Sequence, residues 1–295
     1  MELRSILVAT DFAPGSLPAL AEALRISRWG NTPLRAVHVI DPLVLDDLCE
    51  ALPHLAAELH ASVIQDAQNA WQRLASSLPG LESVPLEVRV GSPARTIAQY
   101  ARETESGLLV MGVRGHRPGA GAGTVAAGVV RAAAVPTLLV RERQDGPFRL
   151  VVACTDFSAG SLLALDYAAR IATQDEAALH VLHTFEPPWR HLHYRAPTPE
   201  ADPQFRTQYQ QVLQRRLESF GSRLGRPLEY LKPVYVLFDA GDHRSGISAY
   251  AQQVNADLVV LGTLGRRSIR DALLGSTAEK VLTECPSSLL AVPAA

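Results

Sequence analysis

Ile6-Leu-Val-Ala-Thr-Asp11-Phe12 returns 145 positions later as Val151-Val-Ala-Cys-Thr-Asp156-Phe157. Each copy is a short apolar run that ends in Thr-Asp-Phe, and the two copies lie in opposite halves of the 295-residue chain. A half of this length matches the size of domain that one hydrophobic core can support. The sequence therefore predicts two copies of one domain, in residues 1–143 and 149–295, and the charged stretch Arg141–Arg149 is interpreted as the linker.

Each half alternates short apolar runs with longer amphipathic ones, which is typical of parallel strands joined by helices. In the first half the expected strands are Ser5–Thr10, Leu34–Ile40, Pro85–Val90, Leu108–Gly112 and Thr137–Val140. In the second half they are Leu150–Thr155, Ala178–Thr184, Val234–Phe238, Leu258–Gly262 and Ser288–Val292. The expected fold class is α/β, with two tandem doubly wound domains. Each is a five-stranded parallel sheet in the strand order 3-2-1-4-5, with helices on both faces.

Between the second and third strands, apolar residues recur at helical spacing in both halves. They are Leu55, Leu59, Val63, Ala67, Trp71, Leu74 and Leu78 in the first half. They are Phe205, Tyr209, Leu213, Leu217, Phe220 and Leu224 in the second. Such stripes are the buried faces of helices, so we expect these side chains, aromatic ones included, to be core.

Composition indicates an ordinary folded protein with no nucleic-acid or membrane function. Hydrophobic residues make up 47% of the chain and the formal net charge is −2, without the strongly basic face of a nucleic-acid binder. The cysteines, Cys49, Cys154 and Cys285, show no metal or disulfide spacing, and no basic-then-apolar leader opens the sequence, so a cytoplasmic location is expected. The apolar stretch Gly119–Val140 is not read as a membrane span, because its counterpart Ile269–Leu290 contains five charged residues.

A glycine pattern follows the fourth strand of the second half: Gly262-x2-Gly265-x9-Gly275-Ser276. Backbone N–H groups at a helix N-terminus bind phosphate, and glycines let the phosphate approach closely. Ser276-Thr277-Ala278-Glu279 fits a capping box with Ser276 as N-cap. Arg266 and Arg267 would place positive charge near the outer phosphates. The alternative is a strand-to-helix loop that binds nothing.

Asp156 follows the first strand of the second half, and two roles are open for its carboxylate. It could cap the following helix, or it could accept hydrogen bonds from the adenine or ribose of a nucleotide. In the strand order 3-2-1-4-5, ligands bind where the winding reverses, between the ends of strands one and four. Asp156 and Gly262 are therefore expected to meet in that crevice.

The first half keeps Gly112 and Gly115 but has Val125-Ala126 where the same spacing would place the Gly275-Ser276 pair. A β-branched residue there would block the phosphate approach, so we expect the first nucleotide loop to be degenerate. A two-residue slip to Gly123-Thr124 would restore the motif with a loop of seven residues.

The sequence resembles the ATP-binding subgroup of the universal stress proteins, in the tandem, two-domain arrangement. The resemblance rests on Asp156-Phe-Ser158, Gly241 and the Gly262-x2-Gly265-x9-Gly275-Ser276 pattern, and it spans both halves. It implies ATP, alone or with Mg²⁺, in the second domain, and pairing of the two domains through Thr137–Val140 and Ser288–Val292. The nucleotide-binding residues it implies are Cys154, Thr155, Asp156, Thr184, Leu261, Gly262, Gly265, Arg266, Arg267, Gly275, Ser276 and Thr277.

Three functions remain open. The first is a nucleotide-dependent regulatory module of the stress response that meets protein partners or forms a homodimer. The second is a slow ATPase or nucleotidyl-transfer enzyme, for which the chain offers no Gly-Lys-Ser/Thr loop and no catalytic residue. The third is a nucleotide-free scaffold. No metal site is expected: His183, His191 and His193 lack zinc-ligand spacing and are interpreted as surface residues, and His38 as a satisfied histidine inside a strand.

Overall fold

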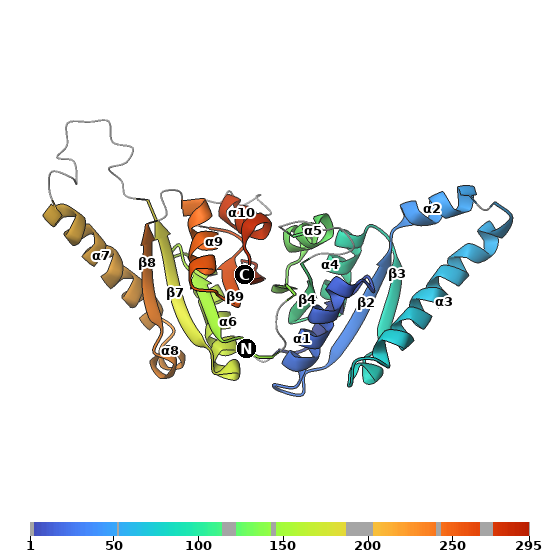
Figure 1. Cartoon of the computed structure of the whole chain (residues 1–295), viewed down its shortest axis with the longest axis horizontal. Helices are drawn as coiled ribbons and strands as arrows, with labels where there is room; N and C mark the ends of the chain where they lie inside the picture. The colour runs from blue at the N-terminus through green and yellow to red at the C-terminus, as the bar shows by residue number, and fades with distance from the viewer. Residues whose placement is uncertain are drawn as a thin grey trace. The chain divides into compact units, whose positions relative to one another are not determined.

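The structure is a computed structural model that describes residues 3–51, 53–113, 122–142, 146–186, 203–239, 243–265 and 274–294 (Figure 1). The chain divides into two compact units, Met1–Asp145 (unit 1) and Gly146–Ala295 (unit 2).

Unit 1 is a parallel sheet with the strand order β3-β2-β1-β4-β5. Its strands are β1 (Ile6–Ala9), β2 (Leu34–Ile40), β3 (Leu86–Val90), β4 (Leu108–Gly112) and β5 (Thr137–Val140). Its α-helices are α1 (Leu17–Ser27), α2 (Pro42–Ala51), α3 (Ala56–Ala75), α4 (Pro93–Glu103) and α5 (Thr124–Ala132). Short 3-10 turns are η1 (Pro14–Ser16), η2 (Pro53–Leu55) and η3 (Leu81–Ser83).

Unit 2 repeats this arrangement, with its strands in the order β8-β7-β6-β9-β10. They are β6 (Leu150–Cys154), β7 (Ala178–Phe185), β8 (Val234–Asp239), β9 (Leu258–Gly262) and β10 (Ser288–Val292). The helices are α6 (Ala159–Asp175), α7 (Pro203–Ser222), α8 (Arg226–Leu231), α9 (His243–Gln253) and α10 (Ser276–Glu284). Counted along each unit, both sheets have the order 3-2-1-4-5, so the predicted fold class is confirmed.

The sequence predicts the strand bounds to within one residue because most of the strands are apolar runs. β1, β4 and β5 are buried along their whole length, as expected for parallel strands covered on both faces. In unit 1, α1 and α3 cover one face, while α4 and α5 pack against each other on the opposite face (Figure 1). None of the helices within the described residues is long and apolar enough to span a membrane. The apolar stretch Gly119–Val140 contains α5, a helix of nine residues.

The predicted helical stripes are mostly core. In α3, Ala67 and Trp71 are buried, and in α7, Leu213, Leu217 and Phe220 are buried. Phe205, at the start of α7, is 46% exposed, so the prediction that this aromatic is core is wrong. It lies in the first turn of its helix, before α7 comes under the sheet.

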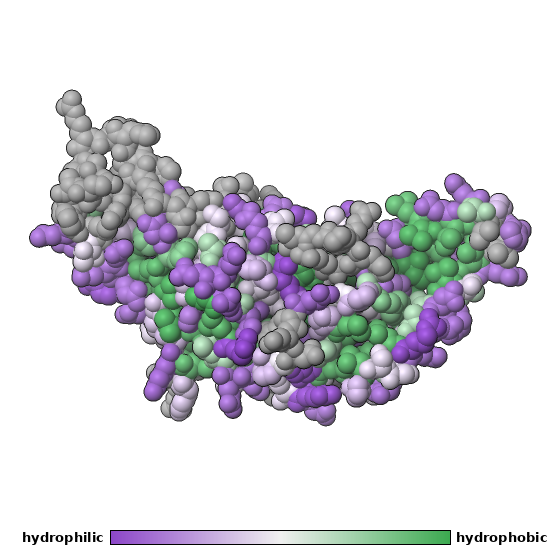
Figure 2. Space-filling view, in the orientation of Figure 1, coloured by the Kyte–Doolittle hydropathy of each residue, from purple (hydrophilic) through white to green (hydrophobic). Residues whose placement is uncertain are grey.

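Helix α2 is an element that we did not expect. It packs on α3, yet it leaves Leu43 and Val44 exposed. The space-filling view shows this apolar area over α2 and beside α3 (Figure 2).

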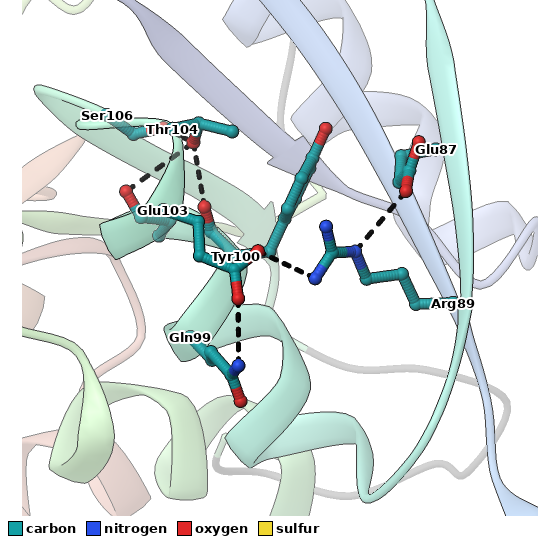
Figure 3. A network of polar contacts seen from close by, with 8 residues as sticks. Glu87, Arg89, Gln99, Tyr100, Glu103, Thr104 and Ser106 are labelled. Atoms are coloured by element: carbon teal, nitrogen blue, oxygen red, sulfur yellow. Dashed lines mark hydrogen bonds and ion pairs between the residues drawn. The ribbon is translucent and has the colours of Figure 1, made fainter.

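A polar network joins α4 to the edge strand β3 in unit 1 (Figure 3). The Arg89 guanidinium lies 4.2 Å from the centre of the Tyr100 ring and donates to Glu103 over 2.7 Å. The hydrogen bond from Gln99, followed by the contact with Arg89, lowers the pKa of Glu103. Unit 2 joins the matching helix differently, through a 2.8 Å hydrogen bond between His180 Nδ1 and the Tyr250 hydroxyl. Burial lowers the pKa of His180, so this pair is a neutral contact.

The segment interpreted as a linker contributes to the core of unit 2. Phe148 is 2% exposed, and its N–H donates to Asp175 over 2.9 Å. Asp257 accepts from the N–H groups of Arg149 at 2.7 Å and Leu150 at 3.1 Å. Residues 148 and 149 are therefore fixed to unit 2.

We expect Gly221→Val to destabilise unit 2 by about 1–3 kcal/mol. Gly221 lies on the buried face of α7, where an added Cβ would be 2.6 Å from Cε1 of Tyr235 on β8. Urea unfolding measures the change, with Gln211→Val on the exposed face of α7 as the control. Equal stability of the two variants would show that Tyr235 moves aside without cost.

Candidate functional site

The candidate site lies at the carboxyl ends of β6 and β9 in unit 2. β6 pairs with β7 on one side and with β9 on the other, so the winding of the chain reverses between β6 and β9. Parallel sheets of this kind bind ligands in the crevice at such a point. The residues that follow these two strands, Thr155–Asp156 and Thr263–Gly265, therefore form its walls.

Asp156 and Gly265 meet across this crevice. A Cβ built on Gly265 would lie 3.0 Å from Oδ2 of Asp156, so the loop backbone passes directly over the carboxylate. The other carboxylate oxygen, Oδ1, accepts the N–H of Ser158 over 3.0 Å. Ser158, not Asp156, caps α6, because its hydroxyl oxygen accepts the N–H of Ser161 over 3.1 Å. The helix-cap role considered for Asp156 is therefore wrong.

Close backbone packing explains a second glycine of the pattern. A Cβ on Gly262 would lie 3.3 Å from the carbonyl carbon of Gly160, in the first turn of α6. A larger side chain at either position would push α6 away from the end of β9. Sequence reasoning missed Gly160; a glycine in the first turn of a helix, where better helix formers are available, was the signal for it.

The glycine loop leads into α10, whose start differs from the prediction. Gly275 is the N-cap, and its N–H donates to the carbonyl of Thr263 over 2.7 Å. Ser276 is the exposed first residue of the helix, so the predicted capping box with Ser276 as N-cap is wrong. The N-cap residue, a glycine, has no side chain to cap the helix. Its first-turn N–H groups, with the positive end of the helix dipole, are an anion-binding arrangement.

In unit 1 the N-cap of the matching helix is Gly123, and the helix begins at Thr124, not at Val125 or later. Gly123 is the N-cap of α5, and its N–H donates to Val113 over 2.8 Å, just as Gly275 donates to Thr263. The counterpart of Gly275-Ser276 is therefore Gly123-Thr124, as in the alternative alignment with a two-residue slip, and the alignment with Val125-Ala126 is wrong. The physical reason is that the loop of unit 1 is two residues shorter, so equal spacing from Gly115 overshoots the helix start.

The other predicted site residues fall into three groups. Cys154, Thr155 and Leu261 are buried, with 7%, 7% and 5% exposure. Burial raises the pKa of Cys154, so its thiol is protonated, and the Thr155 hydroxyl accepts the N–H of Phe157 over 2.9 Å. Thr184 and Thr277 are half-buried. Arg266, Arg267 and Gly241 lie outside the described residues.

Each unit also places a strained aromatic residue beside the crevice. Phe12 and Phe157 have φ of 61° and 66°, in the left-handed region that bulky residues rarely adopt. Each ring packs at a tilt against the histidine of the neighbouring strand, with centroids 4.5 Å apart for Phe12–His38 and 4.4 Å for Phe157–His183.

These histidines are structural parts of the turn. His38 Nδ1 contacts the carbonyl of Thr10 at 2.9 Å, as expected for a satisfied histidine, and His183 Nδ1 contacts that of Thr155 at 2.8 Å. His183 is thus half-buried and bonded, and its interpretation as a surface residue is wrong. Within the described part of the chain, no group of three His, Cys, Asp or Glu side chains is placed to hold a metal ion. His191 and His193 lie outside that part.

The sheets and crevices define a tandem pair of doubly wound α/β domains. The profile of the universal stress protein family matches residues 2–141 and again residues 147–293. The chain belongs to the universal stress protein family and contains two copies of its domain.

Solved structures show the same fold over nearly the whole chain. A putative universal stress protein from Pseudomonas aeruginosa UCBPP-PA14 is 19% identical over 99% of this chain and 93% of its own, with a TM-score of 0.64. A universal stress protein from Archaeoglobus fulgidus DSM 4304 is 20% identical over 99% of both chains, with a TM-score of 0.62. A search of curated proteins found no match.

Proposed function

We propose that unit 2 binds ATP in the crevice between β6 and β9, and that its occupancy regulates how this universal stress protein meets its partners. The observation that carries the proposal is the Asp156 carboxylate held beside the backbone of Gly265, where the winding of the sheet reverses. A carboxylate accepts hydrogen bonds from ribose hydroxyls or an adenine amino group, while a glycine loop receives phosphates.

The nucleotide spans two parts of the crevice. Asp156 and Thr184 lie on the side of β6 and β7, where base and ribose would bind. Gly262, Gly265 and Gly275 line the path to α10, whose first-turn N–H groups would hold the phosphates together with Ser276 and Thr277. Arg266 and Arg267 follow Gly265 directly in the sequence and would add positive charge for the phosphates, with or without Mg²⁺. The base of the crevice would be formed by three buried residues, Cys154, Thr155 and Leu261.

A regulatory binding role is favoured over catalysis. Oδ1 of Asp156 accepts the N–H of Ser158, and the Thr155 hydroxyl accepts the N–H of Phe157. Both groups therefore stabilise the turn after β6. Catalysis of hydrolysis would require a group that positions a water molecule at the outer phosphate. Turnover of ATP by the wild type well above that of a binding-deficient variant would favour the slow-ATPase alternative.

We expect Asp156→Asn to weaken ATP binding about tenfold or more, because hydrogen bonds to a charged group contribute roughly 1.5–3 kcal/mol. Asparagine keeps an oxygen for the Ser158 N–H, so the turn survives, but it removes the charge. Calorimetric titration with ATP measures the change.

The matched control is Asp11→Asn, the same substitution at the equivalent aspartate of unit 1. It should leave the affinity of unit 2 unchanged. Full affinity in Asp156→Asn would remove Asp156 from the site, and no binding by the wild type would favour the scaffold alternative.

A further inference from the structure

Unit 1 contains a hollow of about 350 Å³ that lies outside the glycine-loop crevice. It is lined by Phe12 and by Ala70, Arg73, Leu74 and Ser77. Ala70 and Leu74 are four residues apart on α3, and so are Arg73 and Ser77, the last of which lies just past the end of the helix, so the four residues form two neighbouring rows on one side of it. In the space-filling view, an apolar area lies between α1 and α3 (Figure 2). The volume is in the range of small-ligand sites.

The same place in unit 2 is filled by the chain itself. Phe157, the counterpart of Phe12, has the Arg216 guanidinium 4.3 Å from its ring centre, and the Phe220 ring lies edge-on at 5.7 Å. Arg216 and Phe220 are four residues apart on α7, as Ala70 and Leu74 are on α3. The two units thus share the phenylalanine ring, Phe12 or Phe157, but differ in the side chains that lie beside it. Unit 1 has alanine and leucine where unit 2 has this arginine and phenylalanine, so smaller side chains lie beside Phe12.

The lining residues favour one class of ligand. Phe12, Ala70 and Leu74 offer an aromatic ring and aliphatic surface, which favour a flat apolar group. Arg73 is exposed, and no ion pair or hydrogen bond of its side chain occurs within the described residues. The lining contains this one cation and no acid. A carboxylate would therefore find a charged partner at the rim.

We propose that this hollow is a binding site for a small aromatic carboxylate, whose ring stacks against Phe12 and Leu74 while its carboxylate pairs with Arg73. This ligand is separate from the nucleotide of unit 2, so the proposal goes beyond the function stated above. Unit 2 lacks such a site because Arg216 occupies the ring face of Phe157.

The test is a titration of the full chain with 2-naphthoate, followed by ligand-observed NMR and calorimetry. We expect saturable binding of one molecule per chain, and binding of the neutral 2-naphthylmethanol that is about tenfold weaker. Arg73→Gln should reduce the affinity for naphthoate to that of the alcohol. The control Arg35→Gln changes an exposed arginine on β2 and should have no effect.

Ala70→Arg recreates the arrangement of unit 2 and should abolish binding. Ala70→Leu, a smaller change, should also reduce it, and circular dichroism would confirm that both variants fold. Gly275→Val should bind naphthoate normally even if ATP binding is lost, which separates this proposal from the nucleotide site. Absence of saturable binding, or full binding by both folded Ala70 variants, would overturn the proposal.

Discussion

Replacement of Gly275 by valine should reduce ATP affinity by about a hundredfold or more, since two or more charge-assisted hydrogen bonds of roughly 1.5–3 kcal/mol each are blocked. Gly275 is the N-cap of α10, where a branched side chain would stand in the path of the phosphates to the first-turn N–H groups. The backbone itself accepts valine, because φ is −75° and ψ is 148°, an ordinary extended conformation. The bond from the Gly275 N–H to Thr263 also remains possible.

Calorimetric titration of ATP into nucleotide-free protein measures this loss, and thermal unfolding checks the fold. The matched control is Gly123→Val, which makes the same change at the N-cap of α5 in unit 1. It should leave the binding event of unit 2 intact. If Gly275→Val binds ATP with wild-type affinity, the glycine loop of unit 2 is not the phosphate site.

Replacement of Phe148 by alanine should destabilise unit 2 by about 3–5 kcal/mol, the usual cost of truncating a buried phenylalanine. Phe148 precedes β6 and is 2% exposed, and its N–H is held by Asp175. The substitution leaves a cavity at the point where the chain enters unit 2. This result would show that the domain begins before residue 149.

Urea unfolding followed by circular dichroism measures this change as an earlier transition. Phe205→Ala is the control, because Phe205 is 46% exposed and its truncation should cost less than about 1 kcal/mol. Equal transitions for the two variants would contradict the placement of Phe148 in the core.

The fold was largely predictable from the sequence because most of its strands are apolar runs that alternate with amphipathic helices. β2, β4, β5, β9 and β10 have the predicted bounds. The repeat of Thr-Asp-Phe after β1 and β6 aligned the two units. The strand order follows from right-handed crossovers in a doubly wound sheet, and it correctly predicts that Asp156 lies beside the glycine loop, although the glycine that meets it is Gly265 and not Gly262.

The start of each phosphate-loop helix was not predictable by counting residues. Ser276-Thr277-Ala278-Glu279 satisfied a capping-box pattern with Ser276 as N-cap, but the helix begins one residue earlier than that pattern requires, with Gly275 as N-cap. In unit 1 the loop is two residues shorter, so the residues equivalent to Gly275-Ser276 are Gly123-Thr124. Loop length varies at little energetic cost, whereas the helix start is fixed by the hydrogen bond to the preceding strand.

Side-chain contacts between distant segments were also beyond sequence reasoning. The contact of the Phe12 ring with His38 depends on a positive φ at Phe12 that nothing in the local sequence requires. The contact of Arg216 with Phe157 joins residues about sixty positions apart. The sequence difference between Ala70 and Arg216 therefore shows its effect only when the positions of α3 and α7 relative to Phe12 and Phe157 are known.

The most direct test of the nucleotide site is to denature the purified protein, quantify the released nucleotide by mass spectrometry, and titrate ATP into a nucleotide-free sample in parallel. The account predicts one adenine nucleotide per chain, lost in Gly275→Val. A second equivalent that is lost in Gly123→Val would show that the shorter loop of unit 1 also binds. No released nucleotide and no affinity for ATP would contradict the account and leave the protein as a nucleotide-free scaffold.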